Sequence, residues 1–117
     1  MAEGIISKPM EANSDSAAQY IQEGLWAKRS GTLIILAFRG ISLDATDQDV
    51  TITDALPAKY ASSISMFNLN FPIFDSQSNP SSYTLAGNGY VVGNRLVFHN
   101  RSGKAVNIVG SVMYMGS

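Results

Sequence analysis

The apolar residues of this chain recur in short runs with turn signals roughly every 8–12 residues, a spacing typical of all-β domains. The final run, from about 106 to 115, is apolar on both of the faces that alternate along a strand. A strand with one solvated face should instead alternate apolar with polar residues. We therefore expect this strand either to lie at the centre of a two-layer core or to present its second face to another chain.

A second doubly apolar strand is predicted over residues 32–43, where positions 33–38 are almost all hydrophobic. The run 20–29 is also strand-like, and Ser30-Gly31 between the two runs predicts a hairpin turn. Gly40 inside the second run predicts a β-bulge or a close backbone approach. These features place the hairpin at the centre of the fold.

Glycine and proline residues indicate where turns and strand ends lie in the rest of the chain. Pro72 is expected to end its strand or to confine it to a sheet edge, because proline has no N–H to donate to a neighbouring strand. Residues 86–89 predict a tight turn, since Asn88-Gly89 tolerates positive φ. The other predicted elements are an acidic loop at 44–49, strands at 50–53 and 63–71, and a turn at 100–104 that closes the two or three strands of the last third.

About seven or eight short strands without a convincing helix predict an all-β domain, with an antiparallel β-sandwich or jelly-roll-like fold or a small barrel. With 117 residues the chain is long enough for one domain with a single core. We assign residues 18–117 to this domain. Residues 1–17 are polar and rich in small side chains, and we expect a flexible or extended lead-in or linker there.

Charged residues make up only 15% of the chain, against about 25% in an average soluble domain. Burial of part of the surface in an oligomer explains this scarcity, and a merely neutral surface is the alternative. The net charge of −1 and the scattered Lys and Arg residues disfavour nucleic-acid binding. The longest apolar run, at 33–38, is far short of a membrane helix, and no targeting segment is visible, so we expect synthesis in the cytoplasm without membrane insertion.

Candidate catalytic and metal-binding chemistry is sparse. The chain has no cysteine and one histidine, which excludes disulfides, thiol catalysis and a multi-histidine metal site within one chain. It has no Gly-x-Ser-x-Gly, phosphate-binding or dinucleotide motif, so we expect no enzymatic activity and no cofactor. Asp44, Asp47 and Asp49 could hold Ca²⁺, although their spacing differs from an EF-hand and such Asp/Thr loops are usually just solvated; calcium binding there stays open, and no metal site is assigned.

Three sequence motifs follow one another in an order found in one group of viral proteins. The first is Lys28-Arg-Ser-Gly31 before the long apolar strand, the second is Ala55-Leu-Pro-Ala-Lys-Tyr60, and the third is Gly89-Tyr-Val-Val-Gly-Asn-Arg-Leu-Val-Phe98 with a last strand near the end of the sequence. In this order residues 20–117 resemble the C-terminal head domains of phage tail fibres and receptor-binding proteins. Many such heads have Arg-Pro after the tyrosine, where this chain has Ala61-Ser62.

This resemblance implies a compact β head, usually a homotrimer, at the phage tail tip of the virion. Such a head binds a host cell-surface saccharide without catalysis, and its N-terminal side contacts other tail or baseplate proteins. The alternative is a structural baseplate or tail-fibre module whose apolar faces serve assembly only. An unrelated small lectin-like domain is a third possibility.

Saccharide recognition combines an aromatic face, which covers a sugar ring, with planar polar groups that bond hydroxyls. The single tryptophan is a candidate platform, although a strand tryptophan in a small β domain is more often core. Several polar residues cluster around the last hairpin, where a solvated turn is the alternative explanation. The candidate saccharide-binding residues are Trp26, Asp75, Tyr83, Asn88, Arg95, His99, Asn100 and Arg101.

Overall fold

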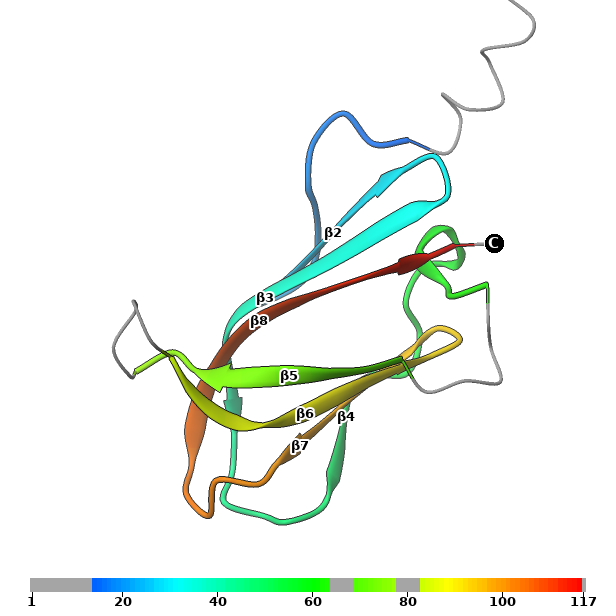
Figure 1. Ribbon diagram of the computed structural model, residues 1–117. Helices are drawn as coiled ribbons and strands as arrows, with labels where there is room; N and C mark the ends of the chain where they lie inside the picture. Colours follow the sequence, from blue (N-terminus) through cyan, green and yellow to red (C-terminus); the bar gives the residue numbers. More distant parts are fainter. Residues whose placement is uncertain (1–13, 64–68, 78–82, 117) are drawn as a thin grey trace, which may run out of the picture.

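The computed structural model describes residues 14–63, 69–77 and 83–116, which form an all-β domain of antiparallel strands (Figure 1). This confirms the predicted fold class. None of the described helices is long and apolar enough to cross a membrane. The elements are β1 (Gln19–Gln22), β2 (Leu25–Ser30), β3 (Leu33–Leu43), β4 (Asp49–Thr53), the short 3₁₀ helix η1 (Ala58–Tyr60), β5 (Leu69–Asp75), β6 (Thr84–Val92), β7 (Arg95–Asn100) and β8 (Val106–Met115).

All eight strands belong to one sheet, in the order β1-β2-β3-β8-β5-β6-β7-β4, which curls strongly into a half-barrel. Strand β8 pairs with β3 along its whole length but with β5 only at Phe74↔Val109 and Asp75↔Ile108. The two halves of the sheet diverge from this short junction, as Figure 1 shows. One curled sheet thus supplies both layers of the core.

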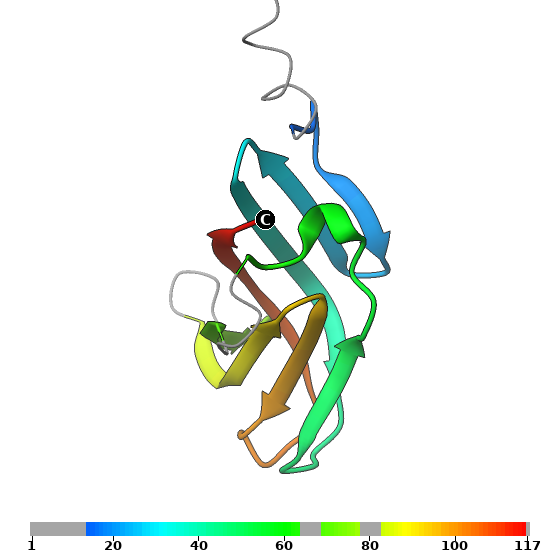
Figure 2. The same cartoon turned by 90° about the vertical axis from the view of Figure 1, so that its right-hand side faces the viewer.

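The open side of the half-barrel is covered by the segment that contains η1 (Figure 2). Leu56 and Tyr60 of this segment are buried. The N–H of Leu56 donates to the carbonyl of Asn94 at 2.8 Å, and the Tyr114 hydroxyl donates to the carbonyl of Tyr60 at 2.6 Å. These bonds tie the segment to the β6–β7 turn on one side and to β8 on the other.

Pro72 lies inside β5 and not at the end of a strand. Among the described residues, β5 pairs with β8 only from Phe74 onward, so the proline sits at a local edge where no N–H is required.

The two outermost strands of the sheet, β1 and β4, approach each other at Gln22 and Ile52. There the side-chain amide of Gln22 in β1 donates to the carbonyl of Ile52 in β4 at 3.2 Å.

Three phenylalanines from the two halves of the sheet meet at the centre of the core. The ring of Phe38 lies 4.8 Å from that of Phe98 and 5.8 Å from that of Phe71, measured between centroids. Glycines face these rings: a Cβ on Gly89 would lie 2.5 Å from the Phe71 ring, and one on Gly110 would lie 2.8 Å from the Phe38 ring. The absence of side chains at these two positions makes room for the aromatic cluster.

The predicted turn at 86–89 is therefore wrong. Those residues lie inside β6, in which Gly87 pairs with Asn100 and Gly89 pairs with Phe98. Here glycine marks close approach between a strand and its surroundings, which is the other common reason for glycine in a strand. The actual turn comes later, at Gly93, whose φ is +62°.

The predicted strand at 20–29 is also wrong as a single element, because the chain reverses in its middle. Gly24 has a φ of +81°, which L side chains rarely adopt, and it separates β1 from β2. By contrast, the bulge predicted at Gly40 is confirmed. The pairing of β3 with β8 shifts register between Arg39 and Ile41, and Gly40 has a φ of +80°.

Strand β8 occupies the residues that the sequence predicts and lies near the middle of the sheet. Its inward side chains Val106, Ile108 and Tyr114 are buried in the core. Met113 and Met115 point outward and are 61% and 53% exposed. The strand is thus central in the fold, and the described residues leave its second apolar face uncovered.

Part of the predicted lead-in packs against the domain through Asp15. Its carboxylate, whose side chain is only 4% exposed, accepts hydrogen bonds from the Arg29 N–H, the Tyr60 hydroxyl and the Lys59 ammonium. Burial opposes the charge on Asp15, but these hydrogen bonds outweigh it and lower the pKa of the carboxyl. Burial and the Asp15 carboxylate in turn raise the pKa of Tyr60 to about 12, so the phenol keeps its proton at neutral pH.

Candidate functional site

The outer face of β5, β6, β7 and β4 carries a concentration of polar side chains, which we call the polar face. Cross-strand pairing builds it in rows, because side chains opposite each other on neighbouring strands lie on the same side of a sheet. Two rows define it, namely Thr51, Val97, Tyr90 and Asn70, and beside them Asp49, His99, Asn88 and Pro72. Residues from four strands are thereby brought to one surface.

A depression of about 420 Å³ lies on the polar face and contains one aromatic ring. It is lined by Asp49, Thr51, Tyr90, Val92, Arg95 and Val97. The Tyr90 side chain is half-buried, so part of its surface stays accessible. One guanidinium nitrogen of Arg95, Nη2, donates to Thr51 Oγ1 at 3.3 Å, which orients the planar group beside the depression. A carboxylate, a hydroxyl and a guanidinium therefore surround an aromatic ring.

His99 lies next to this depression and joins β7 to the acidic loop. Its Nδ1 is 2.8 Å from Asp49 Oδ1, and its Nε2 is 2.6 Å from Asp47 Oδ1. An ionised carboxylate can only accept hydrogen bonds, so both contacts are satisfied when both ring nitrogens carry a proton. The hydrogen bonds to Asp47 and then to Asp49 accordingly raise the pKa of His99 above its ordinary value.

We call the two contacts of His99 with Asp47 and Asp49 the His99 clamp, and we expect this clamp to weaken as pH rises. The folded state favours the imidazolium form of His99. The clamp therefore contributes its full stabilisation of the fold below about pH 6.5, and this contribution is lost as pH rises through the folded pKa of His99. An NMR titration of the His99 ring should give a pKa above 6.5, and Asp47→Asn should lower it. The matched control is Asp54→Asn, an exposed change outside the clamp. A wild-type pKa at or below 6.5 contradicts the clamp.

Arg101 extends the polar face beyond His99. Its Nε donates to Asn88 Oδ1 at 2.8 Å, and the amide nitrogen of Asn88 donates to Asn70 Oδ1 at 3.3 Å. These three planar groups form a line of hydrogen bonds from the end of β7 to β5. Arg101 and Asn70 are exposed and Asn88 is half-buried, so a ligand hydroxyl has access to this line.

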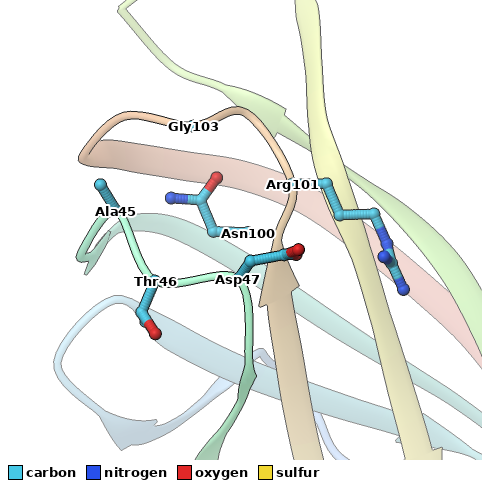
Figure 3. A pocket seen from close by; sticks show the side chains of 6 residues that line it. All are labelled: Ala45, Thr46, Asp47, Asn100, Arg101 and Gly103. Atoms are coloured by element: carbon cyan, nitrogen blue, oxygen red, sulfur yellow. The ribbon is translucent and has the colours of Figure 1, made fainter.

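A second depression, of about 270 Å³, lies beside the turn after β7 (Figure 3). It is lined by Ala45, Thr46, Asp47, Asn100, Arg101 and Gly103. Figure 3 shows Asn100 pointing toward Ala45, whereas Arg101 points the other way, across β6. Asn100 is 3% exposed, and its amide donates to the carbonyls of Asp44 and Lys104 at 3.0 and 2.7 Å. Its hydrogen bonds thus hold the two loops together.

The structure brings four of the eight predicted site residues together: Asn88, Arg95, His99 and Arg101 lie on the polar face. Asp75 is buried elsewhere, where it accepts from the Gln77 N–H, and Tyr83 is half-buried before β6. Trp26 is in the other half of the sheet, with its ring edge-on to Tyr20 at 6.4 Å. The predicted aromatic platform is therefore remote from the predicted polar groups.

Sequence reasoning missed Tyr90, Asp49 and Thr51 as members of this surface. The signal for Tyr90 was present, because Asn88 and Tyr90 alternate with buried Gly89 and Val91 as in a strand with one outward face. The predicted turn at 86–89 concealed that alternation. For Asp49 and Thr51 no local signal exists, since only the pairing of β4 with β7 places them beside Tyr90.

The acidic loop directs two of its carboxylates to the ring of His99 and does not gather them around a common metal position. Asp47 and Asp49 both contact the ring of His99. Within the described ranges no group of three or more His, Cys, Asp or Glu side chains could hold a metal ion.

Comparison with known proteins finds no match to this chain among family models, curated proteins or solved structures. The resemblance to phage head domains thus depends on the sequence motifs alone.

Proposed function

We propose that this domain is a receptor-binding head that binds a host cell-surface saccharide on its polar face, without catalysis. The observation that carries the proposal is the half-buried ring of Tyr90 in a depression of about 420 Å³ between Asp49, Thr51 and Arg95. The volume lies within the range of about 300–1,000 Å³ that small-molecule sites occupy. Its lining combines the two kinds of group that a sugar ring requires.

Each group has a distinct part in this interaction. The accessible surface of Tyr90 covers the apolar side of a pyranose ring, where C–H groups need an apolar neighbour. The Asp49 carboxylate accepts hydrogen bonds from two hydroxyls, and Arg95 donates to ring or hydroxyl oxygens through its planar fork. Because the side chains come from paired strands of a sheet, their spacing is largely fixed before the ligand arrives.

The position of the N-terminal side agrees with the role of a head domain. Ser14, the first described residue, lies beside the β2–β3 turn, where its hydroxyl accepts from the Gly31 N–H at 3.0 Å. The polar face belongs to the other half of the sheet. Attachment to tail or baseplate proteins through the N-terminal side would leave the polar face free for a host receptor at the tail tip.

We predict that Tyr90→Ala and Arg95→Ala each weaken saccharide binding by about tenfold or more, which corresponds to roughly 1.4 kcal/mol. A glycan array identifies the ligand, and isothermal titration with that ligand measures the affinity. Trp26→Ala is the matched aromatic control, because Trp26 is partly exposed but lies on the other half of the sheet. A demonstrated affinity that both polar-face variants leave unchanged would show that the saccharide binds elsewhere.

A structural module of the baseplate or tail fibre is the second candidate function, and one observation favours it. The outer face of the other half of the sheet exposes large apolar side chains, including Met113 and Met115. A module used only for assembly predicts no glycan on an array and no competition with phage adsorption. Binding of a glycan that depends on Tyr90 excludes that alternative.

A further inference from the structure

The outer face of β1, β2, β3 and β8 is apolar over most of its width, and we call it the apolar face. Cross-strand pairing aligns Tyr20 with Trp26 and Trp26 with Ala37, while Ile35 pairs with Met113. The largest exposed side chains on it are Tyr20 at 67%, Met113 at 61%, Met115 at 53%, Trp26 at 37% and Leu33 at 36%. Four adjacent strands thus share one apolar surface that residues 14–63, 69–77 and 83–116 leave uncovered.

The extent of this surface suits a contact with another protein molecule. The five side chains together present on the order of 500 Å² to solvent, given that large aromatic side chains bury about 150–250 Å² each. The largest apolar patch on a typical monomer is about 300–600 Å² and is often functional. A standard interface buries about 800 Å² per partner, with a polar rim around an apolar centre. The apolar face therefore has the size of the centre of such an interface.

The apolar face also carries a projection and a depression that match in size and chemistry. A depression of about 220 Å³ lies over the paired strands β2 and β3, lined by Ala18, Trp26, Ala27, Lys28, Ile35 and Ala37. Met113 projects from β8, on the other side of β3 and at the height of Ile35. A methionine adapts to irregular apolar spaces and makes favourable sulfur–aromatic contacts. One face thus holds both halves of a complementary contact.

We propose that the apolar face is the contact between copies of this chain. Self-association requires a surface that is complementary to itself, and here Met113 of one copy enters the depression beside Trp26 of the next. Stacked sheets lie about 10 Å apart, the distance that interdigitated side chains fill.

Two cations lie on the apolar face, Lys28 of β2 and Arg39 of β3, because each alternates with buried residues of its strand. Lys28 lines the depression, where its long aliphatic stem can pack while its ammonium reaches the rim. Arg39 pairs with Val109 and lies outside the lining of the depression. The exposed carboxylates of Asp47 and Asp49 belong to the polar face, in the other half of the sheet. Self-association through the apolar face therefore leaves the proposed saccharide site open on each copy.

The test is the molar mass of the full chain by light scattering at micromolar concentration. We expect an oligomer for the wild type, with the mass giving the number of copies. Met113→Glu and Trp26→Glu should each yield monomers, because each places a carboxylate inside the contact. Leu85→Glu is the matched control, since Leu85 is 60% exposed on β6 and lies outside the apolar face; it should leave the mass unchanged. Circular dichroism checks that each variant is folded.

Several results would overturn the proposal: a monomeric wild type, an oligomer that survives both substitutions, or equal dissociation by Leu85→Glu. If removal of residues 1–13 converts a monomer into an oligomer, the chain's own N-terminal segment covers the face instead of a second copy. The proposal is independent of saccharide binding. We expect Tyr90→Ala to keep the wild-type mass while it loses affinity, so the failure of either proposal is recognised separately.

Discussion

Replacing Gly87 with alanine is expected to prevent the domain from folding normally. A Cβ at this position would lie 2.0 Å from the carbonyl oxygen of His99 and 3.0 Å from the amide nitrogen of Arg101. Both are backbone atoms of the neighbouring chain segment, so no side-chain rotation can relieve the overlap. We expect a loss of more than about 3 kcal/mol, a large part of the stability of a small domain.

Urea unfolding followed by circular dichroism measures this effect. Leu85→Ala is the matched control, because it also leaves an alanine in β6 but changes an exposed side chain; we expect a change within about 0.5 kcal/mol. A Gly87→Ala variant with wild-type stability would show that β6 and β7 do not approach as closely as described. The same variant should lose saccharide binding, since the pairing of β6 with β7 places Tyr90 beside Val97.

Truncation of Phe98 to alanine should destabilise the domain by about 3–5 kcal/mol. The Phe98 ring is fully buried and contacts the rings of Phe38 and Phe71, with centroids 4.8 and 6.1 Å away. These partners come from β3 and β5, in different halves of the curled sheet. Removal of the ring leaves a cavity between the halves that the rigid strands cannot fully close.

Phe98→Leu provides the graded comparison for this prediction. It keeps most of the apolar volume, so its loss should be clearly smaller than that of the alanine variant. Thermal and urea unfolding of both variants give the two values. Equal losses would indicate that the specific ring packing, and not the cavity volume, dominates at this position.

The core also explains why the polar face has a defined geometry. Along β7 the side chains alternate, so buried Leu96 and Phe98 point inward while Arg95 and His99 point outward. The packing of Phe98 therefore fixes the direction and height of two residues of the proposed site. A site built on paired strands loses little conformational entropy on binding, which favours recognition of a small polar ligand.

The two outer faces of the sheet differ in chemistry, and we assign them different roles. The face of β5, β6, β7 and β4 combines Tyr90 with carboxylate, guanidinium and amide groups, which suits a saccharide. The face of β1, β2, β3 and β8 exposes Met113, Met115 and Trp26, which suits a second protein surface. The few charged residues are unevenly distributed: the polar face carries both signs, in Asp49, His99 and Arg95, whereas the apolar face carries the cations Lys28 and Arg39.

The sequence by itself predicted the all-β antiparallel fold, the bounds of β8 and the bulge at Gly40. These features depend on the side-chain period of two and on the local preferences of glycine, which a single strand expresses without its neighbours. It also identified Arg95 and His99 as polar candidates. Its error at 86–89 arose because a glycine in a turn and a glycine beneath a ring are identical in sequence.

Only the tertiary structure decided which strands pair and which residues thereby share a face. It separated Trp26 from the polar groups and brought Tyr90, Thr51 and Asp49 together from strands far apart in the sequence. It also showed that β8 is central and that the described part of the chain leaves one of its sides uncovered, where the sequence had offered a central position and an outward apolar face as alternatives. The physical reason is that pairing and curling are set by contacts between distant segments, and no local pattern encodes those contacts.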